Sequence, residues 1–174
     1  PDWSRGLGDV YKRQPLRYKS RKNKHPPIIA ICDVSGSMSR YSRMLLHFMH
    51  VLTTLRNDVH TFLFGTRLTN VTRFLRFKDV DEALAATSSA VEDWSGGTRI
   101  GDCLKEFNFN WSRRVLGPGA IVLFITDGLD RGGGIGLSKQ IKLIQKSSKR
   151  LIWLNPLLRY EEFAPKPTGV KAIL

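Results

Sequence analysis

Four continuous apolar runs alternate along the chain with stretches whose apolar residues recur at helical spacing. The runs occupy residues 28–32, 61–64, 120–125 and 150–154. Apolar runs that do not alternate with polar residues are typical of strands in a parallel sheet that is covered on both faces. The pattern therefore predicts one buried strand in each of the four runs.

Helical periodicity lies between these strands. In residues 41–55, apolar side chains follow the i, i+3, i+4, i+7 spacing of an amphipathic helix, at Met44, Leu45, Phe48, Val51, Leu52 and Leu55. Three further helices are predicted: 80–90 with Asp79 as its N-cap, 101–111, and 139–146 with Ser138 as its cap. Residues 68–77 alternate imperfectly, which predicts an exposed edge strand or a hairpin arm.

Strands that alternate with helices of this length connect through right-handed βαβ units. The predicted fold class is therefore α/β: a doubly wound, mostly parallel central sheet with helices on both faces and one antiparallel edge strand. A chain of 174 residues suits one such domain. In sheets of this kind, binding sites form at the carboxyl ends of the strands.

The net charge of +13 is concentrated near the start of the chain. Residues 1–25 hold eight Lys or Arg and two Asp, which accounts for +6 of that total. We expect this basic N-terminal segment to be non-native or disordered in part, and residues 26–174 to form the domain, truncated at its C-terminus. The remaining charge is scattered, without the interleaved aromatic and basic residues of a nucleic-acid groove, so we expect no nucleic-acid partner.

Composition narrows the setting of the protein. The 41% hydrophobic and 25% charged residues are ordinary for a globular domain. No apolar run approaches the roughly 18 residues of a membrane span. The two cysteines, Cys32 and Cys103, provide neither a disulfide framework nor a CxxC metal pair. These features favour a cytoplasmic protein.

Candidate chemistry begins directly after the first predicted strand, where the sequence reads Asp33-Val34-Ser35-Gly36-Ser37. Gly36 permits a tight turn, and the spacing allows both hydroxyls to point into one concavity with the carboxylate. Such hard oxygen donors suit Mg²⁺. The alternative is structural, with Ser37 or Ser39 capping the following helix and Asp33 capping the turn.

Two further loops at the same sheet edge favour the metal site. A glycine-rich loop, Ser95-Gly96-Gly97-Thr98, leads into a predicted helix, and Thr98 is its natural ligand. The sequence Thr126-Asp127-Gly128 places a second carboxylate after a buried strand. The predicted metal ligands are therefore Asp33, Ser35, Ser37, Thr98 and Asp127.

The ordered motifs DxSxS, GGT and TDG resemble the metal-ion-dependent adhesion site of von Willebrand factor A (VWA) domains, whose fold is Rossmann-like. The resemblance covers residues 26 to about 155. It implies that Ser35, Ser37 and Thr98 coordinate Mg²⁺ or Mn²⁺ through hydroxyls, while Asp33 and Asp127 act directly or through water. The sixth position would remain open for an acidic residue of a partner.

Within these domains, the strings around the three motifs and the closing Trp153-Leu154-Asn155-Pro156 are similar to the CoxE-like family. This family is named for accessory proteins of carbon monoxide dehydrogenase maturation. The resemblance implies a non-enzymatic protein-interaction module that acts with a MoxR-type AAA+ ATPase on a client enzyme, such as a molybdenum hydroxylase. The N-terminal extension usual in the family is missing or replaced here.

Two rival functions share the predicted site. A phosphatase-like hydrolase would use Asp33 as nucleophile with Mg²⁺, but such enzymes usually carry a second aspartate two residues later, where this chain has Ser35. The other rival is an extracellular adhesion module with the same metal site. The CoxE-like strings favour the cytoplasmic module.

Several other residues suggest chemistry but have simpler explanations. His47 and His50 lie three apart on the first predicted helix, and we interpret them as structural or surface residues rather than a metal pair. Asp102 either tunes the site or caps its helix, and Asp130 helps to order the glycine run. Residues 131–136 form a rim loop rather than a phosphate loop, because the GxxxxGK[ST] pattern is missing. The basic side chains near the site either steer an acidic partner or are simply solvated, namely Arg40, Arg43 and Arg99.

Overall fold

The computed structural model describes residues 25–91, 97–130 and 136–156. A five-stranded sheet forms its centre, in the order β3-β2-β1-β4-β5. Strands β1 (Ile28–Asp33), β2 (Val59–Phe64), β4 (Ile121–Ile125) and β5 (Arg150–Leu154) run parallel, and β3 (Leu68–Asn70) pairs antiparallel with β2. The predicted α/β fold with one antiparallel edge strand is therefore confirmed.

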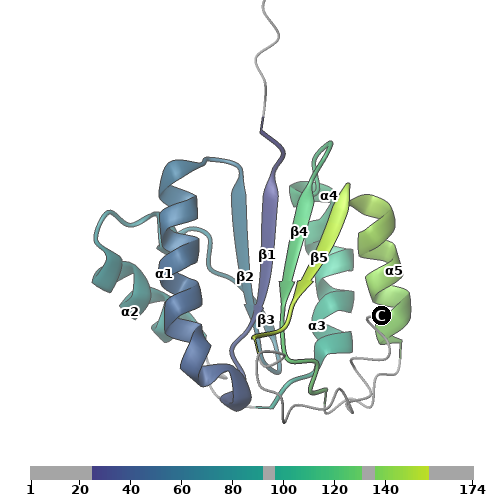
Figure 1. Cartoon of the computed structure of the whole chain (residues 1–174), viewed down its shortest axis with the longest axis horizontal. Helices are drawn as coiled ribbons and strands as arrows, with labels where there is room; N and C mark the ends of the chain where they lie inside the picture. Colours follow the sequence, from purple (N-terminus) through teal and green to yellow (C-terminus); the bar gives the residue numbers. More distant parts are fainter. Residues whose placement is uncertain (1–24, 92–96, 131–135, 157–174) are drawn as a thin grey trace, which may run out of the picture.

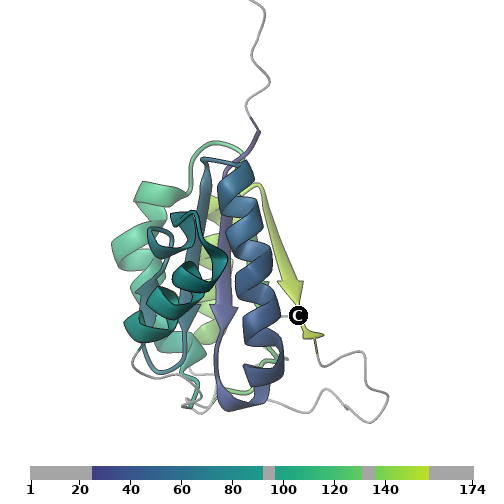
Figure 2. The same ribbon diagram turned by 90° about the vertical axis from the view of Figure 1, so that its left-hand side faces the viewer.

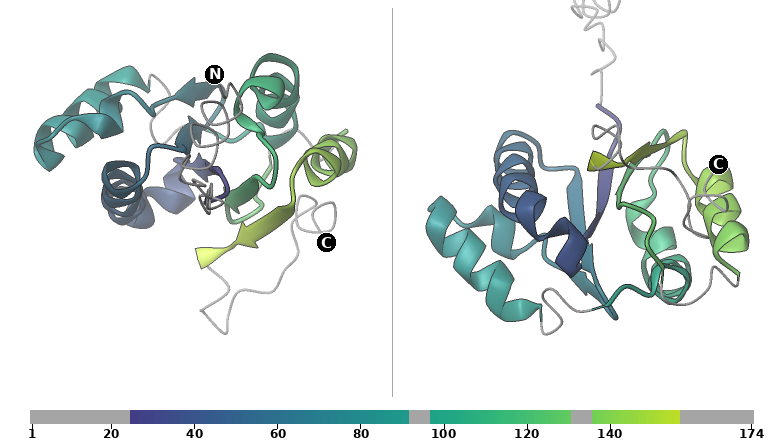
Figure 3. Two further views of the ribbon diagram at one scale, coloured as in Figure 1. Left: turned by 90° about the horizontal axis from the view of Figure 1, so that it is seen from above. Right: turned by 60° about the horizontal axis from the view of Figure 1, so that its bottom comes forward.

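Helices cover both faces of the sheet (Figures 1 and 2). One face carries α1 (Ser39–Leu55) and α2 (Val80–Ala90), and the other carries α3 (Ile100–Glu106), α4 (Ser112–Val115) and α5 (Leu137–Ser147). The view along the strands separates these three layers (Figure 3). Two hydrophobic clusters result, one on each side of the sheet.

The alternation of side chains along the strands divides the core. From β1, Ile29 and Ile31 enter the cluster under α3 and α5, whereas Ala30 and Cys32 enter the cluster under α1. In the first cluster Phe62 packs edge-on against Phe107 with ring centroids 5.2 Å apart. Both faces of the strands are apolar, which explains the unbroken apolar runs in the sequence.

Helix α1 is confirmed, but its buried face differs from the predicted one. The buried side chains are Ser42, Leu46, Met49, His50 and Thr53. Four of the apolar residues that defined the pattern are largely exposed: Met44 (60%), Phe48 (50%), Val51 (51%) and Leu55 (75%). Ser42 and Thr53 can be buried because their hydroxyls donate to the carbonyls of Met38 and Met49, at 3.0 and 2.7 Å.

Three local predictions are wrong in detail. Of residues 68–77, only Leu68–Asn70 is a strand, and Phe74–Arg76 forms a 3₁₀ turn in which Leu75 is fully buried. The helix predicted over 101–111 changes after Glu106 into a π turn, Phe107–Trp111, where the Ser112 hydroxyl donates to the Asn108 carbonyl. Helix α5 begins at Leu137 after Gly136, so Ser138 lies inside it and is not its cap.

Other predictions are confirmed or lie outside the described residues. The Asp79 carboxylate accepts the Glu82 N–H at 2.9 Å, so Asp79 is the N-cap of α2. Cys32 and Cys103 are buried free thiols. In the described part of the chain, no helix has the length and apolarity needed to cross a membrane. The basic segment up to residue 24 and the predicted C-terminal truncation lie outside the description.

Candidate metal centre

The predicted ligands gather where the strand order of the sheet reverses. Strand β1 is followed by α1 on one face, whereas neighbouring β4 is followed by α5 on the other face. The loops that leave these two strands therefore diverge at their carboxyl ends, which is where sheets of this kind place binding sites. Asp33 is the last residue of β1, and Thr126 and Asp127 directly follow β4.

The loop after β1 is held by its own carboxylate. Asp33 is fully buried, and its Oδ1 accepts the Ser35 N–H at 2.8 Å. The hydroxyl oxygens of Ser35 and Ser37 lie 3.1 Å apart. Neither Ser37 nor Ser39 caps a helix, because the 3₁₀ helix Gly36–Met38 and α1 begin without a side-chain cap. The capping explanation for these serines is therefore wrong, whereas Asp33 does hold the turn.

The loop after β4 is joined to Asp33 through Thr126. The Thr126 hydroxyl donates to Asp33 Oδ2 at 2.8 Å and accepts the Gly128 N–H at 3.1 Å. Gly128 has φ +80°, which glycine adopts without strain. Asp127 is fully buried, and its Oδ1 accepts the Leu129 N–H at 2.9 Å. Its Oδ2 is buried and has no hydrogen-bond donor among the described residues.

Thr98 lies in the loop that enters α3, and its side chain is buried. The next residue, Arg99, donates its N–H to the carbonyl of Gly65, directly after β2. The N–H of Ile100 donates to Asp130 Oδ1 at 3.1 Å, which ties this loop to the one after β4. The structure thus brings Asp33, Ser35 and Ser37 together, links Asp127 to them through Thr126, and places Thr98 in a loop at the same edge.

The buried carboxylates of Asp33 and Asp127 would be stabilised by a positive charge between them. The pKa of Asp33 is raised to about 6, mainly by burial and to a smaller extent by the nearby Asp127 carboxylate, while hydrogen bonds from Ser35 and Thr126 oppose the rise. No Lys or Arg is among the groups that shift this pKa in the described part of the chain. Two buried carboxylates without a cation are costly, and a metal ion would offset that cost.

The residues present fit a hard divalent cation. They supply two carboxylates and three hydroxyls, and Oδ2 of Asp127, which accepts no hydrogen bond from the described residues, is an oxygen that could coordinate a metal. Within the described ranges no three His, Cys, Asp or Glu side chains form a metal cluster. Such a cluster is not needed here, because hydroxyl oxygens complete the donor set.

Three residues at this edge were not predicted as parts of the site. Thr126 bridges the two loops, as described above. From the end of β5, Trp153 Nε1 donates to the Thr126 carbonyl at 3.0 Å, and Asn155 Nδ2 donates to the Asp127 carbonyl at 3.3 Å. In the sequence, these residues stood out only because they belong to motifs that resemble the CoxE-like family. That resemblance does not say which groups they contact.

The remaining candidates have structural explanations. His50 is buried and its Nε2 donates to the Phe77 carbonyl at 2.9 Å, whereas His47 is exposed, which agrees with their interpretation as a structural and a surface residue. Asp130 accepts the first N–H of α3 and so helps to cap that helix. Asp102 lies in the first turn of α3, whose N-cap is Arg99. Residues 131–135 of the predicted rim loop lie outside the description.

Comparisons with solved structures agree with this fold. The structure of proximal thread matrix protein 1 from the mussel byssus is similar at 19% identity and a TM-score of 0.54, covering 75% of this chain and 37% of that one. A second structure of the mussel protein, with a zinc-occupied MIDAS motif, is similar at 18% identity and a TM-score of 0.51, covering 75% and 38%. The chain therefore spans less than half of the mussel protein, and the likeness shows the fold alone.

Among curated proteins, none matches this sequence. The family model described as "VWA domain containing CoxE-like protein" matches residues 6–174, which is nearly the whole chain. The chain therefore belongs to the family of CoxE-like proteins that contain a VWA domain.

Proposed function

We propose that this chain is a metal-ion-dependent protein-interaction module. It binds one divalent cation, Mg²⁺ or Mn²⁺, through Asp33, Ser35, Ser37, Thr98 and Asp127. The observation that carries the proposal is the buried Oδ2 of Asp127, which has no hydrogen-bond donor among the described residues. The adjacent Thr126 donates to a second buried carboxylate, that of Asp33, whose loop also carries the paired Ser35 and Ser37 hydroxyls. A cation at this place leaves a coordination position for a carboxylate oxygen of a partner.

The same geometry favours binding over catalysis. Asp33 is fully buried and both of its oxygens accept hydrogen bonds, so it is poorly placed to attack a substrate. Two residues later stands Ser35, whose hydroxyl is a weak acid and a weak base near neutral pH. We therefore propose that the chain is not an enzyme. Phosphomonoester hydrolysis that Asp33→Asn abolishes would instead support the hydrolase.

The proposed partner is a MoxR-type AAA+ ATPase together with its client enzyme, such as a molybdenum hydroxylase, in the cytoplasm. Family membership supports a role in maturation or remodelling of an enzyme complex. Three exposed basic residues flank the candidate centre in sequence and favour an acidic partner surface: Arg40, Arg43 and Arg99. An Asp or Glu of that surface would complete the metal coordination.

The test is a calorimetric titration of the chain with a MoxR-type AAA+ ATPase, in Mg²⁺ and in EDTA. We expect association in Mg²⁺ and a loss of at least about tenfold in affinity in EDTA, in Thr98→Ala, and in a partner that lacks the acidic residue. Circular dichroism checks that Thr98→Ala is folded. Equal affinity under all conditions would rule out a metal bridge even if the complex itself formed.

A further inference from the structure

The loop that carries Asp127 is held from outside by the end of β5. We propose that Trp153 and Asn155 are positioning residues that aim the Asp127 carboxylate and thereby set the affinity of the centre for its cation. The inference rests on the proposed metal site and adds to it two residues that are not ligands.

The two contacts act on the peptide units on either side of Asp127. Trp153 Nε1 donates to the Thr126 carbonyl, which belongs to the preceding unit, at 3.0 Å. Asn155 Nδ2 donates to the Asp127 carbonyl, which belongs to the following unit, at 3.3 Å. Because each peptide unit is planar, holding both units fixes the φ and ψ angles between them. These angles set the direction of the Cα–Cβ bond of Asp127, and the Leu129 N–H holds the carboxylate itself through Oδ1.

Two further bonds hold the loop, one at the peptide unit before Thr126 and one at the unit that follows Asp127. The Thr126 N–H donates to the Leu154 carbonyl at 3.2 Å, which continues the pairing of β4 with β5. The Gly128 N–H donates to the Thr126 hydroxyl, which in turn donates to Asp33. Rotation of the loop around Asp127 would therefore break bonds on both sides of the residue. The side chains of Trp153 and Asn155 supply two of these bonds.

The indole ring of Trp153 is held in place by packing, so its N–H has a fixed position. Its indole packs against the hydrophobic cluster under α3 and α5, so a rigid apolar core supports the N–H that holds the loop. Asn155 follows the strand directly and is partly buried. Outer groups that orient a metal ligand commonly change metal affinity by 10–100-fold when they are removed. The contacts here act through the backbone and not on the ligand side chain itself, so we expect each to contribute less than that range.

Each proposed positioning residue has a matched control elsewhere in the chain. Trp153→Phe keeps the aromatic packing but removes the N–H, and Trp111→Phe makes the same change in a ring that packs on the same core against Phe62. Asn155→Ala removes a side-chain donor to a carbonyl. Asn108→Ala removes a similar donor, to the Gln140 carbonyl, in the π turn.

The experiment measures the dissociation constant of Mn²⁺ by calorimetry and by electron paramagnetic resonance, using the intact chain. We expect Trp153→Phe and Asn155→Ala each to weaken Mn²⁺ binding roughly 3- to 10-fold, and the double variant about 10- to 100-fold. Both controls should keep the wild-type constant. Melting temperatures in EDTA separate positioning from stability, because a merely structural residue would lower them without changing Mn²⁺ affinity.

Two failures are distinguishable. Wild-type protein that does not bind Mn²⁺ would overturn the proposed metal site itself. Wild-type protein that binds Mn²⁺ while the Asn155→Ala and Trp153→Phe variants bind equally well would overturn only the positioning role. If Trp153→Phe does not fold, the Mn²⁺ dissociation constants of Asn155→Ala and of its control Asn108→Ala decide the question.

Discussion

At the scale of single residues, the two buried aspartates of the centre differ in how far the protein satisfies them. Asp33 has hydrogen bonds to both oxygens, from the Ser35 N–H and the Thr126 hydroxyl. Asp127 has one such bond, and its other oxygen is buried with no hydrogen-bond donor in the described ranges. Since an unsatisfied buried carboxylate oxygen is costly, Asp127 destabilises the metal-free protein.

This difference predicts opposite effects of Asp127→Asn with and without metal. The amide keeps an acceptor for the Leu129 N–H and removes the buried charge, so in EDTA we expect the variant to melt at or above the temperature of the wild type. With Mg²⁺ or Mn²⁺ at about 100 times the dissociation constant, the wild type should gain about 2.7 kcal/mol and the variant almost nothing. Differential scanning calorimetry under both conditions measures this.

Asp58→Asn is the control for that experiment. Asp58 is exposed and directly precedes β2. It therefore lies at the amino ends of the parallel strands, whereas the candidate metal centre lies at their carboxyl ends. The control should melt like the wild type in EDTA and should gain the same stability from metal. A wild-type melting temperature that EDTA and Mg²⁺ leave unchanged would contradict the assignment of the metal centre.

At the scale of elements, apolar runs predicted the strands well because β1 and β4 are covered on both faces. The failures occurred where a contact distant in sequence decides the local structure. Leu75 is buried in a 3₁₀ turn against α1 and α2, so residues 74–76 leave the expected strand. The π turn after Glu106 is held partly by Asn108, whose amide donates to Gln140 of α5. The apolar pattern of residues 68–77 or 101–111 does not show these contacts, because the contacting residues lie in other segments of the chain.

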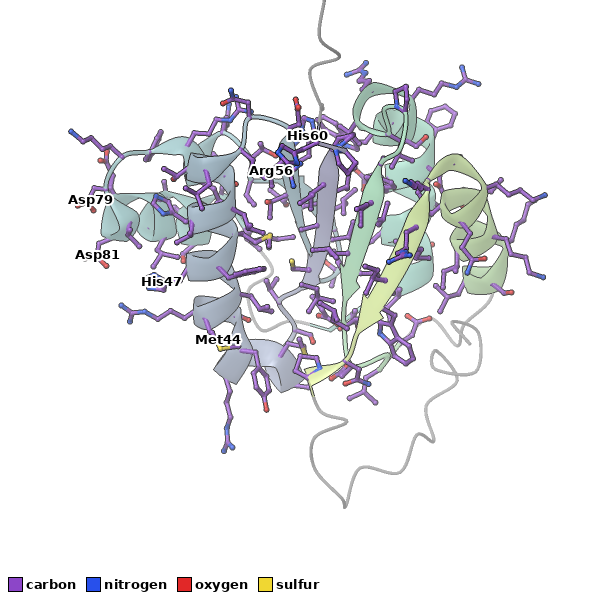
Figure 4. All side chains as sticks on the ribbon, turned by 45° about the horizontal axis from the view of Figure 1, so that its top comes forward. Met44, His47, Arg56, His60, Asp79 and Asp81 are labelled. Carbon is purple, nitrogen blue, oxygen red and sulfur yellow. The ribbon has the colours of Figure 1, made fainter. Side chains whose placement is uncertain are left out.

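Helix α2 gives a quantitative test at this scale. Asp79 and Asp81 both place a negative charge at the N-terminus of the helix (Figure 4), but only Asp79 accepts a backbone N–H, that of Glu82. Asp79→Ala should therefore cost about 1 kcal/mol of unfolding free energy. Asp81→Ala should cost only the weaker interaction with the helix dipole, about 0.3–0.5 kcal/mol.

Urea unfolding followed by circular dichroism measures both α2 variants. Equal losses for Asp79→Ala and Asp81→Ala would show that charge alone, and not the capping bond, stabilises the start of α2.

At the scale of the whole molecule, the sequence motifs located the candidate centre because strand ends in a parallel sheet meet at one edge. They could not locate Trp153 and Asn155, because the pairing of β5 beside β4 is a property of the assembled sheet. The apolar periodicity of the sequence also predicted the wrong buried face for α1. Met44 and His47 project from that helix away from the sheet (Figure 4), while Ser42 and Thr53 are buried.

This division of apolar side chains predicts the stability of two phenylalanine variants. Phe107 is fully buried, packs edge-on against Phe62 and belongs to the core under α3 and α5, so Phe107→Ala should cost about 3–5 kcal/mol. Phe48 is 50% exposed on α1, so Phe48→Ala should change the unfolding free energy by no more than about 0.5 kcal/mol. Urea unfolding at two protein concentrations measures both.

A loss for Phe48→Ala that approaches that of Phe107→Ala would mean that the outer face of α1 is covered in solution. If that loss also grew with protein concentration, the cover would be a second copy of the chain.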